Sequence, residues 1–168
     1  MGENSAGKST LIKVLTGVHP ADAGVGRWAG ARWPSSPREA EAAGISTVFQ
    51  EINLIPTLSV AENITLGRQA SRLGFLRWGE IRRRAKAALA RLGLDVDPSR
   101  QVGSCAMAVQ QMVAIARALD IDCRVLVLDE PTSSLDEAEV AELFKAMRRL
   151  RDEGIAIVFV TPLSQPGL

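Results

Sequence analysis

Residues 124–136 read Arg-Val-Leu-Val-Leu-Asp-Glu-Pro-Thr-Ser-Ser-Leu-Asp. The apolar run from Val125 to Leu128 is typical of a strand buried on both faces of a parallel sheet. Asp129 and Glu130 follow at the carboxyl end, where open α/β sheets bind ligands. Buried carboxylates without a cation are costly, so we expect Asp129 to hold Mg²⁺, directly or through water, and Glu130 to orient or deprotonate an attacking water. The alternative is a strand followed by an acidic helix N-cap.

A glycine-containing loop stands at the other end of the chain. Residues 2–9 read Gly-Glu-Asn-Ser-Ala-Gly-Lys-Ser and match G-x-x-x-x-G-K-[ST]. Such a loop turns backbone N–H groups toward phosphate oxygens, Lys8 reaches the β- and γ-phosphates, and the Ser9 hydroxyl ligates Mg²⁺. The amphipathic segment 10–16 predicts a helix whose positive dipole end points at the phosphates. A chance glycine turn before a helix is the alternative, weakened because the two motifs complete one site.

The composition narrows the functional classes. Lys and Arg number 20 against 19 Asp and Glu, so the net charge of +1 gives no general case for nucleic acid or anionic lipid. His19, expected in a loop, is the one histidine, which argues against a zinc site or a Ser-His-Asp triad. Cys105 and Cys123 lack metal spacing and favour a reduced, cytosolic setting. No apolar run reaches the ~20 residues of a membrane helix, and we expect the chain itself to be soluble.

Local patterns predict further elements. Ser59 and Glu62 form a capping box that opens a short helix. Residues 79–92 and 137–151 are amphipathic at helical spacing, and residues 155–160 are typical of another buried strand.

Two groups of side chains have competing interpretations. The basic residues of the helix at 79–92 are expected on a solvated face rather than in a nucleic-acid site; they are Arg82, Arg83, Arg84 and Lys86. Trp28 and Trp33 are expected in the core or in a hairpin rather than in a base-stacking platform.

Three further segments carry a family resemblance. Residues 103–119, Gly-Ser-Cys-Ala-Met-Ala-Val-Gln-Gln-Met-Val-Ala-Ile-Ala-Arg-Ala-Leu, resemble the signature segment of ATP-binding-cassette (ABC) ATPases. Val-Phe-Gln-Glu at 48–51 resembles the glutamine loop, and Ser-Leu-Asp at 134–136 resembles the D-loop. The chain thus resembles the ATP-binding subunit of an ABC importer. Residues 36–64 and 109–113 look like the monosaccharide (ribose, xylose or galactose) branch, in which one polypeptide carries two tandem cassettes.

The resemblance implies a fold and a reaction. The fold would be α/β, of the P-loop NTPase type, with a mostly parallel sheet and a helical signature subdomain at about residues 68–120. ATP would lie between the phosphate loop of one cassette and the signature segment of a second, and Glu130 would drive its hydrolysis. The implied ATP contacts are Gly2, Asn4, Ser5, Ala6, Gly7, Lys8, Ser9, Thr10 and Gln50. The implied Mg²⁺ ligands are Ser9, Gln50 and Asp129.

The resemblance also implies partners and a location. These are a second cassette, in tandem or as a dimer, membrane permease subunits that meet the region around Gln50, and indirectly a sugar-binding protein, with no nucleic acid. The protein would lie peripherally on the cytoplasmic face of the plasma membrane. A soluble ABC protein of DNA repair or translation is less favoured, because residues 36–64 look like sugar importers.

Three features depart from the family pattern. Only Met1 precedes Gly2, where the family has a strand and, upstream, an aromatic residue that stacks on adenine. Ala106 replaces a serine that donates to the γ-phosphate, and Pro162 stands where the family has a histidine. We therefore interpret residues 1–161 as a partial cassette, incomplete at both ends, with an aberrant tail at 162–168. The alternative function is a hydrolysis-deficient nucleotide-binding remnant without transport activity, and we expect marginal stability and aggregation.

Overall fold

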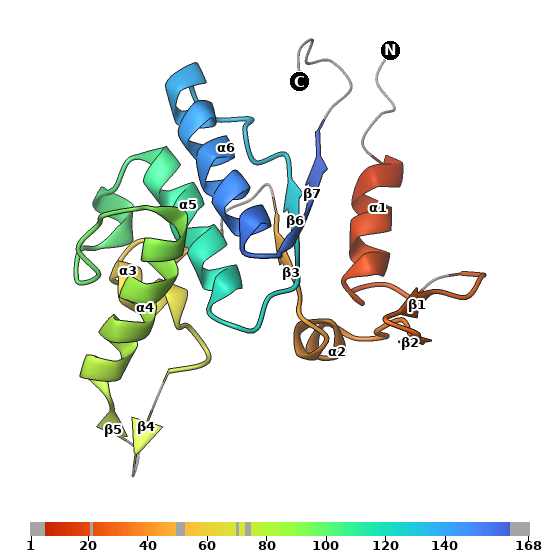
Figure 1. Ribbon diagram of the computed structural model, residues 1–168. Coiled ribbons are helices and arrows are strands. Elements are labelled where there is room, and N and C mark those ends of the chain that lie inside the picture. Colours follow the sequence, from red (N-terminus) through yellow and green to blue (C-terminus); the bar gives the residue numbers. More distant parts are fainter. Residues whose placement is uncertain (1–5, 21, 50–52, 70, 73–74, 162–168) are drawn as a thin grey trace.

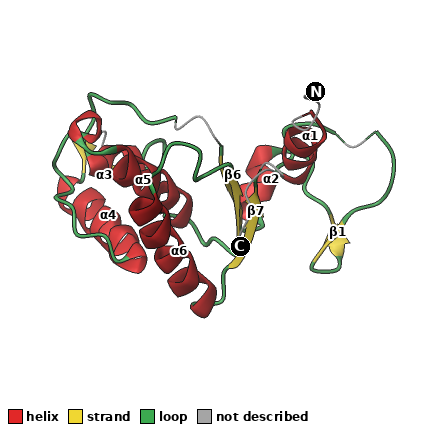
Figure 2. Ribbon diagram, turned by 90° about the horizontal axis from the view of Figure 1, so that it is seen from above, coloured by secondary structure: helices red, strands yellow, loops and turns green. Residues whose placement is uncertain are grey.

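The computed structural model describes residues 6–20, 22–49, 53–69, 71–72 and 75–161. A small parallel sheet stands in the middle, with helices α3 to α6 on one side and helices α1 and α2 on the other (Figures 1 and 2). Within the described ranges, no helix is both long and apolar enough to cross a bilayer.

The sheet has three parallel strands in the order β3-β6-β7. They are β3 (Ile45–Val48), β6 (Val125–Asp129) and β7 (Ala156–Val160). Leu126 and Leu128 of the central strand are fully buried, which confirms the predicted buried strand. Strand β3 was not predicted, because four residues carry too weak a periodic signal to separate them from a loop. Its place is fixed by pairing with β6, where Ile45 lies opposite Val125 and Val48 opposite Leu128.

Helices on one side of the sheet form a single core with it. They are α3 (Val60–Ile64), α4 (Trp78–Leu92), α5 (Met107–Leu119) and α6 (Glu137–Asp152), and a 3₁₀ turn, η1 (Val102–Ser104), precedes α5. The predicted capping box of Ser59 and Glu62 is confirmed, and Asp136 with Glu139 forms a second one at α6. The apolar positions predicted for α4, from Ile81 to Leu92, are all buried.

The other side carries α1 (Ala6–Leu15), α2 (Pro37–Ala42) and a hairpin of β1 (Arg27–Trp28) and β2 (Ala31–Arg32). Trp28 packs edge-on against Trp33, with ring centroids 5.8 Å apart. The indole N–H of Trp33 donates to the Leu15 carbonyl at 3.0 Å, which ties the end of α1 to this hairpin. The prediction of a hairpin role for the two tryptophans is therefore confirmed. A second hairpin, β4 (Ser71–Arg72) and β5 (Phe75–Leu76), precedes α4.

Arg84 corrects one prediction about the basic face of α4. Arg82, Arg83 and Lys86 are exposed as predicted, whereas Arg84 is half-buried and donates to the carboxylate of Asp120. The sequence pattern did not show this pair, because the two residues belong to different helical segments that meet only in the fold.

Candidate functional site

The backbone has an unusual conformation at Glu130, directly after the end of β6. Glu130 has φ 49°, in the left-handed region, which costs a residue with a Cβ about 1–2 kcal/mol. Its N–H donates to the Val160 carbonyl of β7 at 2.8 Å, and its carbonyl accepts from the Ser133 N–H at 3.3 Å. These bonds hold the strained conformation, so Glu130 leaves the sheet in a direction set by β7 and the next turn.

The electrostatics of this strand end favour a bound cation. Burial, and secondly the neighbouring charge of Glu130, raise the pKa of Asp129 above its ordinary value. A divalent cation would stabilise the charged carboxylate and so offset both effects, which means that the carboxylates fit Mg²⁺. The described residues contain no group of three or more His, Cys, Asp or Glu side chains that could hold a metal ion.

The phosphate-loop motif leads into α1, which begins at Ala6. Figure 1 shows that α1 begins at the same end of the molecule at which β6 and β7 end. Gly7, Lys8, Ser9 and Thr10 lie in the first turns of this helix. The first turn contains no acidic residue, so no carboxylate within that turn offsets the positive end of the helix dipole. The other predicted ATP contacts, Gly2, Asn4, Ser5 and Gln50, lie outside the described residues.

The signature-like segment is anchored on the far side of the sheet. Ala106 is the N-cap residue of α5, and no side chain caps this helix. The Gln110 amide donates to the Cys105 carbonyl at 2.9 Å, and Cys105 is buried beneath the turn. Both views place α1 and α5 on opposite sides of the sheet (Figures 1 and 2). The α5 N-cap residue Ala106 and the phosphate-loop helix α1 of the same chain therefore belong to opposite sides of the sheet.

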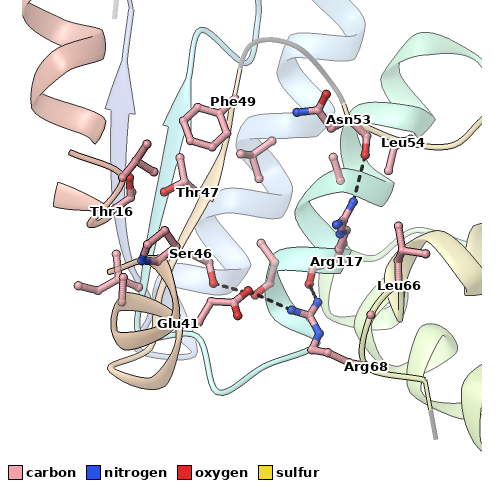
Figure 3. A pocket seen from close by; sticks show the side chains of 18 residues that line it. Thr16, Glu41, Ser46, Thr47, Phe49, Asn53, Leu54, Leu66, Arg68 and Arg117 are labelled. Carbon is pink, nitrogen blue, oxygen red and sulfur yellow. Dashed lines mark hydrogen bonds and ion pairs between the residues drawn. The ribbon is translucent and has the colours of Figure 1, made fainter. Parts of the chain in front are cut away.

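A cavity of about 470 Å³ opens between β3 and the helical side of the molecule (Figure 3). Phe49, which belongs to the predicted glutamine loop, and Asn53, which follows that loop, both line it. The buried hydroxyl oxygen of Thr47, also in its wall, has no hydrogen-bond partner among the described residues. A polar group entering from outside would satisfy this oxygen.

Two guanidinium groups stand at the same cavity, and neither was predicted. Arg68 donates to the Arg117 carbonyl at 2.8 Å, and Arg117 donates to the Asn53 carbonyl at 3.0 Å. Burial, and secondly the charge of Arg68, lower the pKa of Arg117, while Glu41 opposes this effect. The sequence signal for Arg117 was an arginine near the end of a mostly apolar helix, and such a signal does not specify a cavity.

Comparison with known proteins gives the class of this molecule. Residues 1–133 match the family model described as ABC transporter. The chain belongs to the ABC transporter family, and its fold is that of the ATP-binding cassette.

The relatives by sequence are components of sugar importers. The chain is 52% identical over 166 residues to the ribose import ATP-binding protein RbsA of Chromobacterium violaceum. It is 49% identical over 162 residues to the galactofuranose transporter ATP-binding protein YtfR of Escherichia coli. Each alignment covers 96% of this chain and 32% of the relative. The chain thus spans about a third of the length of these curated relatives.

Solved cassettes share the fold over most of this chain. The chain superimposes on cbiO1 of Clostridium perfringens, part of the ABC transporter complex cbiONQ, with a TM-score of 0.78 and 30% identity. That match covers 96% of this chain and 64% of cbiO1. The dimeric ATP-binding cassette MJ0796, bound to ADP and Pi, gives a TM-score of 0.73 and 26% identity, over 92% of this chain and 69% of that cassette.

Proposed function

We propose that this chain binds Mg²⁺–ATP and hydrolyses it to energise the import of a monosaccharide through a membrane ABC transporter. The observation that carries this proposal is the position of Asp129 and Glu130. They lie at the carboxyl end of the central strand, at the end of the molecule where the phosphate-loop helix begins. The names of the sugar-import relatives support the transport role.

Each predicted site residue has a proposed role. ATP would be contacted by Gly2, Asn4, Ser5, Ala6, Gly7, Lys8, Ser9, Thr10 and Gln50. Mg²⁺ would be held by Ser9, Gln50 and Asp129. The ion neutralises charge on the phosphates when it is bound. The Glu130 carboxylate would accept a hydrogen bond from the attacking water and then take up its proton. Its backbone, held by the Val160 carbonyl, keeps that carboxylate at the end of the sheet.

A second cassette would complete the site. The signature-like segment and α1 lie on opposite sides of the sheet, so the two halves of one composite site would come from two different cassettes. The dimeric structure of MJ0796 supports a pair of cassettes. Helices α3 to α5, with the helical subdomain at about 68–120, would carry the signature segment toward the partner's ATP.

The cavity at β3 is the proposed contact with the permease subunits. It lies directly beside the glutamine-loop segment, and it offers an unpartnered hydroxyl together with two guanidinium groups. A sugar-binding protein would act indirectly, on the other side of the membrane. The chain would then work peripherally at the cytoplasmic face.

Ala106 favours a second candidate function, in which ATP is bound but not turned over. The residue lacks the hydroxyl that would contact the γ-phosphate across the dimer, and loss of a hydrogen bond to a charged group costs about 1.5–3 kcal/mol.

The test compares Glu130→Gln with the wild type and with Glu142→Gln, which makes the same change at an exposed position on α6. Mg²⁺–ATP binding is measured by calorimetry, and phosphate release is measured in the same samples. We expect Glu130→Gln to keep ATP binding and to lose hydrolysis at least about 100-fold, while Glu142→Gln behaves as wild type. Wild-type phosphate release no higher than that of Glu130→Gln would assign binding without turnover. Absence of ATP binding in all three proteins would refute the proposal.

A further inference from the structure

Large apolar side chains gather at the hairpin that precedes α4. Phe75 is 80% exposed, and Leu76 and Trp78 are each 43% exposed, within four consecutive positions. Figure 1 shows this hairpin projecting from the body of the molecule beyond the first turn of α4. Single exposed apolar residues are common on soluble proteins, whereas a group of large ones marks a contact surface.

Cations lie directly beside these apolar side chains. Trp78, Arg82 and Lys86 are spaced four residues apart and therefore follow one another along one face of α4, with Arg83 next to them. All three cations are exposed. The surface formed by Phe75, Leu76, Trp78, Arg82, Arg83 and Lys86 is called the hairpin–α4 surface below.

Part of the positive charge on the hairpin–α4 surface is not balanced by neighbouring carboxylates of the described residues. Among the described side chains of this region, three other cations are held in the ion pairs Arg77–Glu80, Arg84–Asp120 and Arg91–Glu153. Asp97 lies near Arg82, although its carboxylate accepts hydrogen bonds from Ser99. Within the described part of the chain, Arg83 and Lys86 have no ion pair. Exposed cations beside exposed apolar side chains suit a partner that carries negative charge next to an apolar region.

We propose that the hairpin–α4 surface binds the surface of an anionic lipid bilayer. Aromatic and aliphatic side chains on a projecting hairpin suit the boundary between headgroups and acyl chains, and adjacent cations attract anionic headgroups. The cavity proposed for the permease includes none of these residues, so lipid contact and permease contact use different surfaces. Lipid binding by this surface is separate from nucleotide binding and needs no turnover of ATP.

The experiment measures binding of the 168-residue chain to vesicles by co-sedimentation. One set of vesicles is phosphatidylcholine alone, and the other contains equal parts of phosphatidylcholine and phosphatidylglycerol. We expect binding to the anionic vesicles that weakens with added salt, and little binding to the neutral ones. In a Trp28→Phe, Trp33→Phe background, Trp78 is the remaining tryptophan, and its emission is expected to shift to shorter wavelength on binding.

Matched variants locate the binding surface. Arg83→Gln with Lys86→Gln is expected to lower binding about fivefold for each cation, or about twenty-five-fold together. Lys145→Gln with Arg148→Gln removes the same charges, also three residues apart on an exposed helix face, and is expected to leave binding unchanged. Phe75→Ala is expected to lower binding about tenfold, and its high exposure makes it safe for folding.

Three outcomes would overturn the proposal. The first is equal binding to neutral and anionic vesicles, and the second is equal loss in the α4 and α6 double variants. The third is a Trp78 shift that appears only with vesicles containing permease subunits, which would assign the surface to a protein partner.

Discussion

Arg84 and Asp120 form a two-point ion pair across 36 residues of sequence, with Arg84 Nε 3.1 Å from one carboxylate oxygen and an Nη donor on the other. The Asp120 side chain is 3% exposed, and Arg68 reaches the same carboxylate at 3.4 Å. Arg84 also donates to the Arg68 carbonyl at 2.7 Å. One buried acid thus joins α4, the end of α5 and the segment after α3 that lines the cavity.

Removing that acid should weaken the whole helical side. Asp120→Asn leaves two guanidinium groups without their carboxylate, and we expect a loss of about 2 kcal/mol in the free energy of unfolding. This is below the 3–5 kcal/mol of fully buried pairs, because the Arg84 side chain is 27% exposed. Urea unfolding measures the change. Asp152→Asn, which breaks the exposed pair with Arg151, is the control and should have little effect. Equal losses in the two variants would contradict a special role for Asp120.

The backbone at Glu130 makes a second prediction. Glu130→Gly relieves the left-handed strain, whereas Glu130→Gln retains it. We therefore expect the free energy of unfolding to be about 1 kcal/mol higher for the glycine variant than for the glutamine variant. Hydrolysis should be lost in both. Chemical denaturation of the two proteins gives the difference directly. A glutamine variant as stable as the glycine variant would mean that residue 130 is not strained.

Alanine substitutions at Gly44 and Gly154 distinguish the stability cost of backbone strain from the cost of close packing. Both have positive φ, 82° and 91°, but a Cβ on Gly44 would lie 2.7 Å from the Asp122 carbonyl oxygen, whereas a Cβ on Gly154 meets nothing within 4 Å. Gly154→Ala should cost about 1 kcal/mol from strain alone. Gly44→Ala should cost about 1–3 kcal/mol more, because the loop before β3 must move away from the chain entering β6. Thermal melts of both variants test this order, and the reverse order would refute it.

The raised pKa of Asp129 predicts how the stability of the metal-free protein depends on pH. Its pKa is raised, by burial first and by Glu130 second, so the folded state holds the proton more tightly than the unfolded state. The stability this provides is complete below the ordinary aspartate pKa of about 3.9, and it is lost as the pH rises through the higher folded pKa. In EDTA at pH 7, Asp129→Asn should therefore melt above the wild type, and the difference should shrink toward pH 4. A wild type that melts higher at pH 7 would contradict this sign.

Ala106 offers a stabilising substitution. It is the N-cap of α5 with extended ψ, and no side chain accepts from the first turn. Ala106→Ser should add about 1 kcal/mol to the free energy of unfolding. Ala141→Ser, at an exposed position inside α6, should be neutral or slightly destabilising and serves as the control. If ATP turnover also rises in Ala106→Ser only, the missing hydroxyl limits hydrolysis.

Local sequence patterns determined the elements whose signal repeats within a few residues. The apolar run of β6, the buried face of α4 and the capping box at Ser59 were all predicted, because strand burial, helical period and caps are properties of neighbouring residues. The motifs at residues 2–9 and 103–119 identified the family for the same reason, since each is a contiguous set of residue types.

Only the tertiary structure decided how distant residues meet. The strand β3 is fixed by its pairing with β6. The cavity beside it is lined by residues far apart in the sequence, among them Asn53 and Arg117, which form a hydrogen bond across 64 residues. Arg84, predicted on the solvated face of α4, instead pairs with Asp120. The left-handed backbone at Glu130 is held by a hydrogen bond to the Val160 carbonyl. Each of these features arises from contacts between segments far apart in the chain, which residue periodicity and single motifs do not encode.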